Sequence, residues 1–388
     1  MTTSQHDLAV DPTLVELNHA SFGAPTRAAL ARAQDERARI ERDTARGLGP
    51  DLTVRLREQA RALEALVGAD PGSLALTANS TEGHGALTAS LPLAAGDHVL
   101  LADLEYASVL RGWQVACERV GATADVVPLA LPATADQVLA TVAAMHPATR
   151  VVVLSAITSS TALALPVREV AAICRERGVT LVVDAAHVVG HAPLDVADLG
   201  ADAVLGSLHK WLPVPRAVGF LWLAPHLRDR VRPAVVSLAW DSEDLVERFG
   251  WRGTWDPAPA LGLGAAIAEH DAWRAAGDLD RAVELADRLS ETLTGLGLRA
   301  TGTAELVPRR LRAFLVDGVT LPTLRAALDG AGVRAWTGTA PDGTTLLRVS
   351  THVHTAPGDD AALAAGLRTA RRSHEPLPAP GAPPLDRR

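Results

Sequence analysis

The strongest constraint on the fold is an alternation of short apolar runs with helical patterns through the middle of the chain. Six runs read as strands, at 98–102, 124–129, 150–155, 180–184, 203–206 and 218–223. Helical patterns follow the first three runs, at about 106–120, 134–145 and 166–177. This alternation predicts an α/β fold with a mainly parallel sheet sandwiched by helices. In such sheets, ligands bind beyond the carboxyl ends of the strands.

The ends of the chain have a different character. Two helices rich in Ala, Leu, Glu and Arg are predicted at 26–45 and 51–67, and after a helical stretch at 256–297 the elements become shorter. We expect four parts: an N-terminal segment at 1–30 that contributes to the active site and the small domain, a large domain at 31–250, a smaller α+β domain at 251–372, and a Pro-rich tail at 373–388. The composition of the tail predicts disorder.

Composition excludes several classes of protein. The net charge of −8 and the scattering of Arg among acidic residues argue against nucleic-acid binding. No stretch approaches the roughly 20 apolar residues of a membrane span, and the N-terminus lacks the pattern of a signal peptide. The only cysteines, Cys117 and Cys174, fall in helical patterns without partners at metal-ligand spacing. We therefore expect a cytoplasmic protein without a disulfide framework or a metal site.

Lysine occurs once in this chain. Lys and Arg together number 37, and Lys210 is the single lysine, so 36 are arginine. Arginine stays protonated at any working pH, whereas a lysine amine can lose its proton and attack a carbonyl carbon. A surface position is the commoner reading of any one lysine. The single occurrence of Lys210, just after the run 203–206, favours Schiff-base chemistry instead.

Asp184 ends the run 180–184 and begins the segment Asp184-Ala-Ala-His187. A carboxylate at the tip of a buried strand is costly unless it has a cationic partner. A pyridinium nitrogen is such a partner, and pyridoxal phosphate supplies one. The alternative is a helix N-cap. The gap of 26 residues between Asp184 and Lys210 favours the cofactor.

A phosphate site is predicted where Thr77-Ala-Asn-Ser-Thr-Glu82 precedes a helical run. Asn79 and Glu82 resemble a capping box, and the free amides of a helix start bind phosphate. Most capping boxes only cap a helix, so this signal is weak alone. The candidate phosphate ligands are Ser80, Thr81 and, beside the lysine, Ser207 and His209.

Two further residues stand out by type and position. Tyr106, the only tyrosine, follows a predicted strand, where its ring can stack on a flat cofactor or pack under a helix. Arg348 lies within the apolar run 345–350. Its planar guanidinium suits bidentate binding of a carboxylate.

Ordered segments carry a resemblance to a known family. They lie at 17–23, 157–162, 165–167, 184–187, 207–210 and 251–256. The set resembles the fold-type I pyridoxal-phosphate enzymes of the class V aminotransferase family, within its isopenicillin N epimerase-like and carbon–sulfur lyase-like branch. The likeness runs from about residue 15 to 372.

The resemblance implies a role for each matching position. Lys210 would form the Schiff base with pyridoxal 5′-phosphate and then carry a proton, Asp184 would keep the pyridinium nitrogen protonated, and Tyr106 would stack on the ring. The other implied roles are phosphate binding by Ser80, Thr81, Ser207, His209 and the second subunit's Thr254, contact with the phenolic oxygen by Thr158 and His187, and substrate binding by Arg348, Asn18 and His19. A site shared in this way implies a homodimer that acts on a small amino-acid substrate.

The chain departs from the cysteine desulfurases of this family. Those enzymes carry a nucleophilic cysteine shortly before the carboxylate-binding arginine, whereas the stretch 335–343 has none. A persulfide-forming desulfurase is therefore not expected. The segment 350–355 resembles instead the carbon–sulfur lyases of ergothioneine biosynthesis. Four tryptophans in or beside the site segments, at 211, 251, 255 and 336, are candidates for walls of a roomy pocket or for ordinary packing.

The shared residues leave the reaction open. Such a cofactor acidifies the Cα–H of an amino acid, and Lys210 would remove that proton. We favour β-elimination from a bulky cysteine S-conjugate, in thiol or natural-product biosynthesis, over an epimerase or an aminotransferase. A non-catalytic pyridoxal-phosphate binder is the alternative from a different class.

Overall fold

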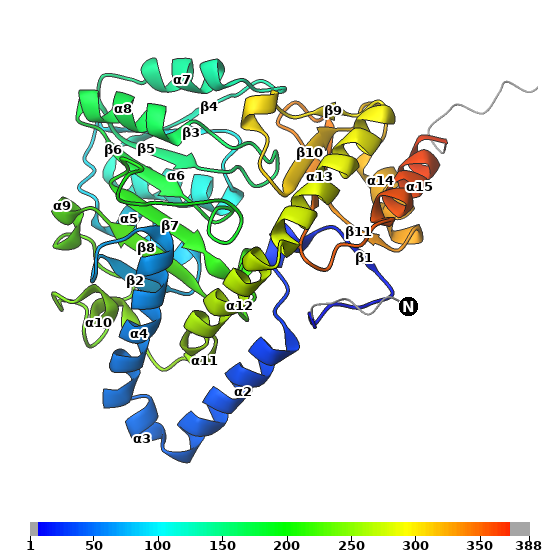
Figure 1. Cartoon of the computed structure of the whole chain (residues 1–388). Helices are drawn as coiled ribbons and strands as arrows, with labels where there is room; N and C mark the ends of the chain where they lie inside the picture. Colours follow the sequence, from blue (N-terminus) through cyan, green and yellow to red (C-terminus); the bar gives the residue numbers. More distant parts are fainter. Residues whose placement is uncertain (1–6, 373–388) are drawn as a thin grey trace, which may run out of the picture.

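The computed structural model describes residues 7–372, and the tail predicted at 373–388 lies outside the described residues. Figure 1 shows a large sheet with helices on both faces, beside a smaller sheet that the last helices cover. No helix of residues 7–372 is both long and apolar enough to cross a membrane.

The large sheet has seven strands in the order β2-β8-β7-β6-β5-β3-β4. Their bounds are β2 Leu74–Thr77, β3 His98–Ala102, β4 Thr123–Val127, β5 Thr149–Ser155, β6 Thr180–Asp184, β7 Ala203–Ser207 and β8 Gly219–Leu223. Only β8 runs antiparallel to its two neighbours, so the prediction of a mainly parallel sheet is confirmed. Sequence reasoning missed β2, because its four residues show too short a pattern to separate from a loop.

Each buried strand sends alternate side chains to two separate cores. In β5, Val152 and Leu154 join one core, and Val151 and Val153 join the other. The first core is covered by α4 (Pro50–Val67), α7 (Ala135–Ala143) and α8 (Val167–Arg177), the second by α5 (Ser80–Ser90), α6 (Ala107–Val120), α9 (Pro225–Arg228) and α10 (Leu245–Gly250). Because both faces are covered, polar side chains gather at the strand ends.

Further helices extend the first face. After α2 (Arg27–Arg42), the short α3 (Thr44–Gly47) turns the chain into α4. The gap between the helices predicted at 26–45 and 51–67 lies at this turn. The helices α11 (Ala258–Leu261) and α12 (Leu263–Ala275) pack against α4.

The smaller sheet is antiparallel, in the order β12-β13-β10-β9. Its elements are β9 Arg299–Ala300, β10 Leu311–Leu315, β12 Trp336–Thr339 and β13 Thr345–Ser350, with the helices α13 Asp278–Gly295, α14 Leu321–Gly330 and α15 Asp359–Arg372. The two-residue β1 (Val15–Glu16) pairs with β11 (Val333–Arg334). These two strands form a separate sheet, and an isolated bridge between Asn18 and Ser350 joins the N-terminal segment to β13 of the smaller sheet. The domain limits stay a prediction.

Gly23 marks a close approach between two parts of the chain that carry site residues. It ends α1 (His19–Phe22) with φ of 66° and ψ of 171°, a conformation that essentially only glycine adopts. A Cβ placed there would lie 1.7 Å from the carbonyl oxygen of His209, in the short 3-10 helix η1 (Leu208–Lys210). The glycine therefore lets α1 pack directly on the turn that holds Lys210.

We expect Gly23→Ala to destabilise the protein by about 3 kcal/mol or more, since backbone strain and a clash with backbone act together. Gly178→Ala is the matched control. Gly178 has φ of 65°, but an added Cβ would meet nothing within 4 Å. The control should cost only about 1 kcal/mol. Urea unfolding measures both, and equal losses would contradict the close approach.

Candidate functional site

A cavity of about 410 Å³ opens at the carboxyl ends of the parallel strands. This is where the fold class predicts a ligand. It brings together ten of the residues singled out from the sequence: Asn18, Ser80, Thr81, Tyr106, Asp184, His187, Ser207, His209, Lys210 and Arg348. Three others, His19, Thr158 and Thr254, do not line it.

Asp184 is buried at the tip of β6, with 6% of its surface exposed. Its Oδ1 accepts a hydrogen bond of 2.8 Å from the Ala186 amide, and its Oδ2 lies 3.1 Å from Nε2 of His84. Burial alone would raise the pKa of Asp184, but the hydrogen bond from His84, the positive charge of Lys210 and the hydrogen bond from the Ala186 amide outweigh it and lower the pKa. The carboxylate is therefore held as an anion.

His84, on α5, is the residue that fixes this carboxylate. The indole N–H of Trp113 donates to His84 Nδ1 over 3.2 Å, so Nδ1 is an acceptor. The proton of a neutral His84 must then sit on Nε2, which donates it to Asp184. Trp113, His84 and Asp184 form one chain of hydrogen bonds that orients the carboxylate.

His187 is oriented toward Lys210 by a tryptophan, as His84 is toward Asp184. Trp211 donates its indole N–H to His187 Nδ1 over 3.4 Å, and His187 Nε2 lies 3.3 Å from the Lys210 Nζ. Burial lowers the pKa of His187 well below its usual value, so the ring is neutral and carries its proton on Nε2. That N–H can donate only to an uncharged amine, whose lone pair is free.

The Lys210 amine is set up to lose its proton. Burial lowers its pKa to about 8, with help from the positive charge of Arg348 and against the negative charge of Asp184. With this pKa, about a tenth of the amine is uncharged at pH 7, and that fraction can act as a nucleophile or a general base.

The start of α5 supplies a group of hydroxyl and amide donors. The Asn79 side chain accepts from the Glu82 amide and so caps the helix. The Glu82 side chain accepts from the Ala78 amide over 2.6 Å instead of from Asn79, so the predicted capping box is only half formed. The Ser80 amide and hydroxyl lie 3.1 and 3.2 Å from the Ser207 Oγ. Thr81 lies at the same helix start, where amides without intrahelical partners suit an anion.

Arg348 is a buried cation whose hydrogen-bond acceptors are all neutral. Nη1 donates to the Ser159 carbonyl (2.8 Å) and hydroxyl (3.3 Å), and Nη2 donates to Asn18 Oδ1 (3.2 Å) and Ser21 Oγ (2.6 Å). Burial lowers its pKa to about 10, so it stays charged. A buried guanidinium without a carboxylate partner is suited to an anionic ligand.

Aromatic rings flank this region. The Tyr106 ring is half exposed, and the Lys210 Nζ lies 5.9 Å from its centre. Trp336 lines the cavity with the Arg348 guanidinium 5.2 Å over its ring. Trp211 is fully buried behind the lysine, and neither Trp251 nor Trp255 lines the cavity. Of the four tryptophans, Trp336 lines the cavity and the other three do not, so ordinary packing is the better reading for those three.

The three predicted residues outside the cavity have other surroundings. The Thr158 hydroxyl is engaged within its own turn, with Thr161 Oγ1 at 2.7 Å and the Leu163 amide at 2.8 Å. His19 is buried and stacks on His352. Thr254 is exposed to solvent. For Thr158 and His19 the structure gives packing or turn contacts in place of the implied ligand contacts.

Sequence reasoning missed two buried polar residues next to Asp184. His84 lies 100 positions before its partner, and only its place one helical turn after Ser80 pointed to the site. Glu105 follows β3 and accepts from the amide (2.7 Å) and hydroxyl of Ser155, and burial raises its pKa to about 7. Its position after a strand was the available signal.

Neither cysteine lines the cavity. Both are buried, Cys117 in α6 and Cys174 in α8. Burial raises the pKa of Cys117 and raises that of Cys174 to about 11. Neither thiol is therefore in a setting that makes it nucleophilic.

Comparison with known proteins gives a consistent picture. The family model described as aminotransferase class-V matches residues 29–356. The isopenicillin N epimerase of Amycolatopsis lactamdurans is 33% identical over 398 residues, covering 94% of this chain and 97% of that protein. A protein of Oryza sativa subsp. japonica that carries the name L-cysteine desulfhydrase 1 is 38% identical over 177 residues, 43% of this chain and 36% of that protein.

Solved structures share the fold. The cystine C–S lyase C-DES, in complex with its reaction product cysteine persulfide, has a TM-score of 0.79 and 24% identity, and the match covers 92% of this chain and 97% of that one. The expected fold class is thereby confirmed.

The relatives imply pyridoxal 5′-phosphate as the cofactor. The cavity fits this group by the chemistry of its donors. An uncharged amine suits the aldehyde carbon, the buried Asp184 anion suits the ring nitrogen, and the start of α5 suits the phosphate. The cofactor would therefore be held by Lys210, Asp184 and the hydroxyls of Ser80, Thr81 and Ser207.

Because the chain has one lysine, the amine of Lys210 can be titrated directly. After reductive ¹³C-methylation of the apoprotein, its methyl signal should shift with a midpoint near pH 8, since burial favours the uncharged form. Asp184→Asn should lower this midpoint further, and Arg348→Gln should raise it, because each removes the charge that acts in the opposite direction. Lys210→Arg identifies the signal by its loss. A midpoint at 10.5, the value of an exposed lysine, would contradict the burial.

Proposed function

We propose that this chain, which belongs to the aminotransferase class-V family, is a pyridoxal-phosphate-dependent lyase that eliminates the sulfur substituent from a cysteine S-conjugate. One observation separates this reaction from that of a cysteine desulfurase. The cavity contains an amine base and a guanidinium whose hydrogen-bond acceptors are all neutral, and no cysteine is among the described residues that line it. A persulfide-forming desulfurase needs a thiol in reach of the substrate, so that route is not supported.

The residues divide the work of such a reaction. Bound pyridoxal phosphate supplies an electron sink that acidifies the Cα–H of an amino acid. Arg348 binds the α-carboxylate, and Asn18 and Ser21 hold the guanidinium in place. His84 keeps Asp184 ionised and oriented.

Lys210 then moves the proton. Its uncharged amine takes the proton from Cα, the Cβ–S bond breaks, and the sulfur leaves with its bonding electrons and takes up a proton. The neutral His187 N–H lies 3.3 Å from the lysine and can hold the amine in position during this transfer. With one water consumed, the products are a thiol, pyruvate and ammonia.

An epimerase is the second candidate. The relative that is similar over nearly its full length carries that name. Epimerisation requires the proton to return to the opposite face of Cα, and an aminotransferase requires it to go to the cofactor carbon. The amine, the guanidinium and the carboxylate serve all three reactions.

Product analysis separates these reactions. Incubation with S-alkyl and S-glycosyl cysteines should give equal amounts of thiol and pyruvate, measured by mass spectrometry. Lys210→Ala should lower turnover by about 10²- to 10⁴-fold through loss of the base. The Cys117→Ala/Cys174→Ala variant should keep turnover within about twofold of wild type, because neither thiol takes part.

Other products would reject elimination. With free cysteine as a further substrate, alanine with protein-bound persulfide would show a desulfurase. With any of the substrates, unchanged mass with inverted chirality would show an epimerase. A 2-oxo acid formed together with the aminated cofactor would show an aminotransferase.

We also propose a homodimer. Thr254 is exposed and outside the cavity, so a contact between it and a phosphate would have to be made in another subunit. An exposed apolar segment at 235–238 also supports a dimer. In it, Val235, Val236 and Leu238 are 58%, 75% and 87% exposed. Such a run is typical of a covered interface.

Leu238→Asp should therefore shift the mass measured by light scattering from dimer to monomer, since burying a carboxylate opposes association. The side chain is exposed in the single chain, so the variant should fold. Val54→Asp, at an exposed valine on α4, is the control and should leave the mass unchanged. A wild-type mass of one chain would reject the dimer.

A further inference from the structure

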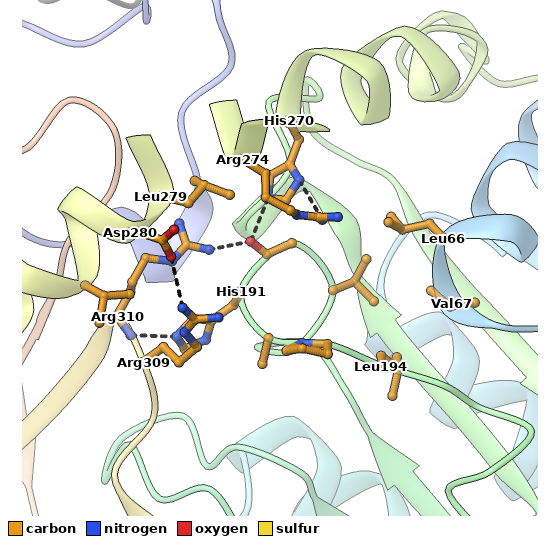
Figure 2. A pocket seen from close by; sticks show the side chains of 15 residues that line it. Leu66, Val67, His191, Leu194, His270, Arg274, Leu279, Asp280, Arg309 and Arg310 are labelled. Carbon is orange, nitrogen blue, oxygen red and sulfur yellow. Dashed lines mark hydrogen bonds and ion pairs between the residues drawn. The ribbon is translucent and has the colours of Figure 1, made fainter. Parts of the chain in front are cut away.

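A second cavity, of about 300 Å³, lies apart from the cofactor site. It is bounded by α12, the start of α13 and the loop that follows β6. Figure 2 shows Arg309 and Arg310 on one side of it and apolar Leu66, Val67 and Leu194 on the other. Nothing in the proposed reaction uses this cavity.

Arg310 is the unusual residue in its wall. It is 2% exposed, and its Nη2 donates to the Gly190 carbonyl. Its Nη1 is buried and has no hydrogen-bond partner among residues 7–372. Burial lowers its pKa to about 9, so the guanidinium is still charged at neutral pH. A buried cation with an unmet donor is costly unless a ligand completes it.

The other charges around the cavity leave it positive. Arg309 pairs with Asp280 at 3.1 Å. Arg274 reaches Asp271, which does not line the cavity, at 3.3 Å, and its side chain is 57% exposed. Three arginines therefore line the space with one aspartate.

The two histidines of the wall do not add charge. His191 accepts the Arg310 amide at Nε2 over 2.8 Å, and its Nδ1 lies 2.8 Å from the His187 carbonyl. His270 Nε2 lies 2.8 Å from the Gly190 carbonyl. Burial lowers the pKa of both rings, so both are neutral. The positive charge of the cavity comes from arginine alone.

A neighbouring group of three histidines has the spacing of a metal site. One ring nitrogen from each of His19, His352 and His354 lies within 4.8 Å of the others, and their Nδ1 atoms have no partner among the described residues. The positive charge of Arg310 acts on both His19 and His352, which disfavours a dication there. The same charge favours an anion in the cavity.

We propose that this cavity binds a small oxyanion, a carboxylate or a phosphate, between the unpaired Nη1 of Arg310 and the exposed guanidinium of Arg274. Arginine presents paired N–H groups that match two oxygens of such an anion. This site is separate from the reaction proposed above and does not depend on it.

The anion would lie close to the machinery around Lys210. The Arg310 guanidinium lies 5.0 Å over the ring of Trp211, which directly follows the lysine and donates to His187. A ligand bound to Arg310 would therefore be separated from His187, which contacts the Lys210 amine, by the side chain of Trp211.

Calorimetric titration of the holoenzyme with sodium phosphate, and separately with sodium acetate, tests the proposal at constant ionic strength. At least one anion should bind saturably. Arg310→Gln should weaken that binding about tenfold or more, because charged hydrogen bonds are lost, and Arg274→Gln should weaken it several-fold. Arg281→Gln is the matched control, at an arginine of α13 outside the cavity that pairs with Asp278, and it should leave affinity unchanged.

The two titrants identify the chemistry, since binding of only one of them assigns the site to phosphate or to carboxylate. A carboxylate bound at Arg348 would not respond to Arg274→Gln. If Arg310→Gln fails to fold, Arg274→Glu must abolish binding by reversing the charge. No saturable binding of either anion, or equal affinity in the Arg274 variants and wild type, would overturn the proposal.

Discussion

The buried carboxylate of Asp184 is the constraint around which the cavity is arranged. A charge at the tip of a central strand must be met by donors, and α5 supplies one of them through His84. The same helix begins with the hydroxyls and amides that suit a phosphate. One helix therefore positions two groups that would hold opposite ends of the cofactor, and the indole of Trp113 sets the proton of the connecting ring.

The charges of the site are incompletely compensated within the described chain. Asp184 has one neutral imidazole and one amide as partners, and Arg348 has only neutral oxygens. A pyridinium nitrogen would compensate the charge of Asp184, and a substrate carboxylate would compensate the charge of Arg348. Asp184 raises the pKa of Lys210 and Arg348 lowers it, and with burial the pKa is about 8. Part of the amine is therefore uncharged and can react. This arrangement explains why a chain rich in arginine keeps one lysine.

Much of the fold could be read from periodicity. The runs at 98–102 and 180–184 coincide with β3 and β6, because buried parallel strands leave continuous apolar stretches between helices. Strand ends also located Lys210, Asp184 and Tyr106. What the pattern could not give were contacts between distant residues, such as the pair of His84 and Asp184, 100 positions apart. There was also no sign in the sequence that the Thr158 hydroxyl would bind within its own turn, to Thr161, and not face the cofactor.

The central claim is that the Lys210 amine carries the cofactor. Borohydride reduction of the holoenzyme, followed by peptide mass spectrometry, tests it most directly, because a reduced Schiff base is a permanent label and this chain offers one lysine. We expect a pyridoxyl phosphate label on the peptide that contains Lys210. An unlabelled Lys210 peptide, with the cofactor recovered free or attached to the N-terminal amine, would contradict it.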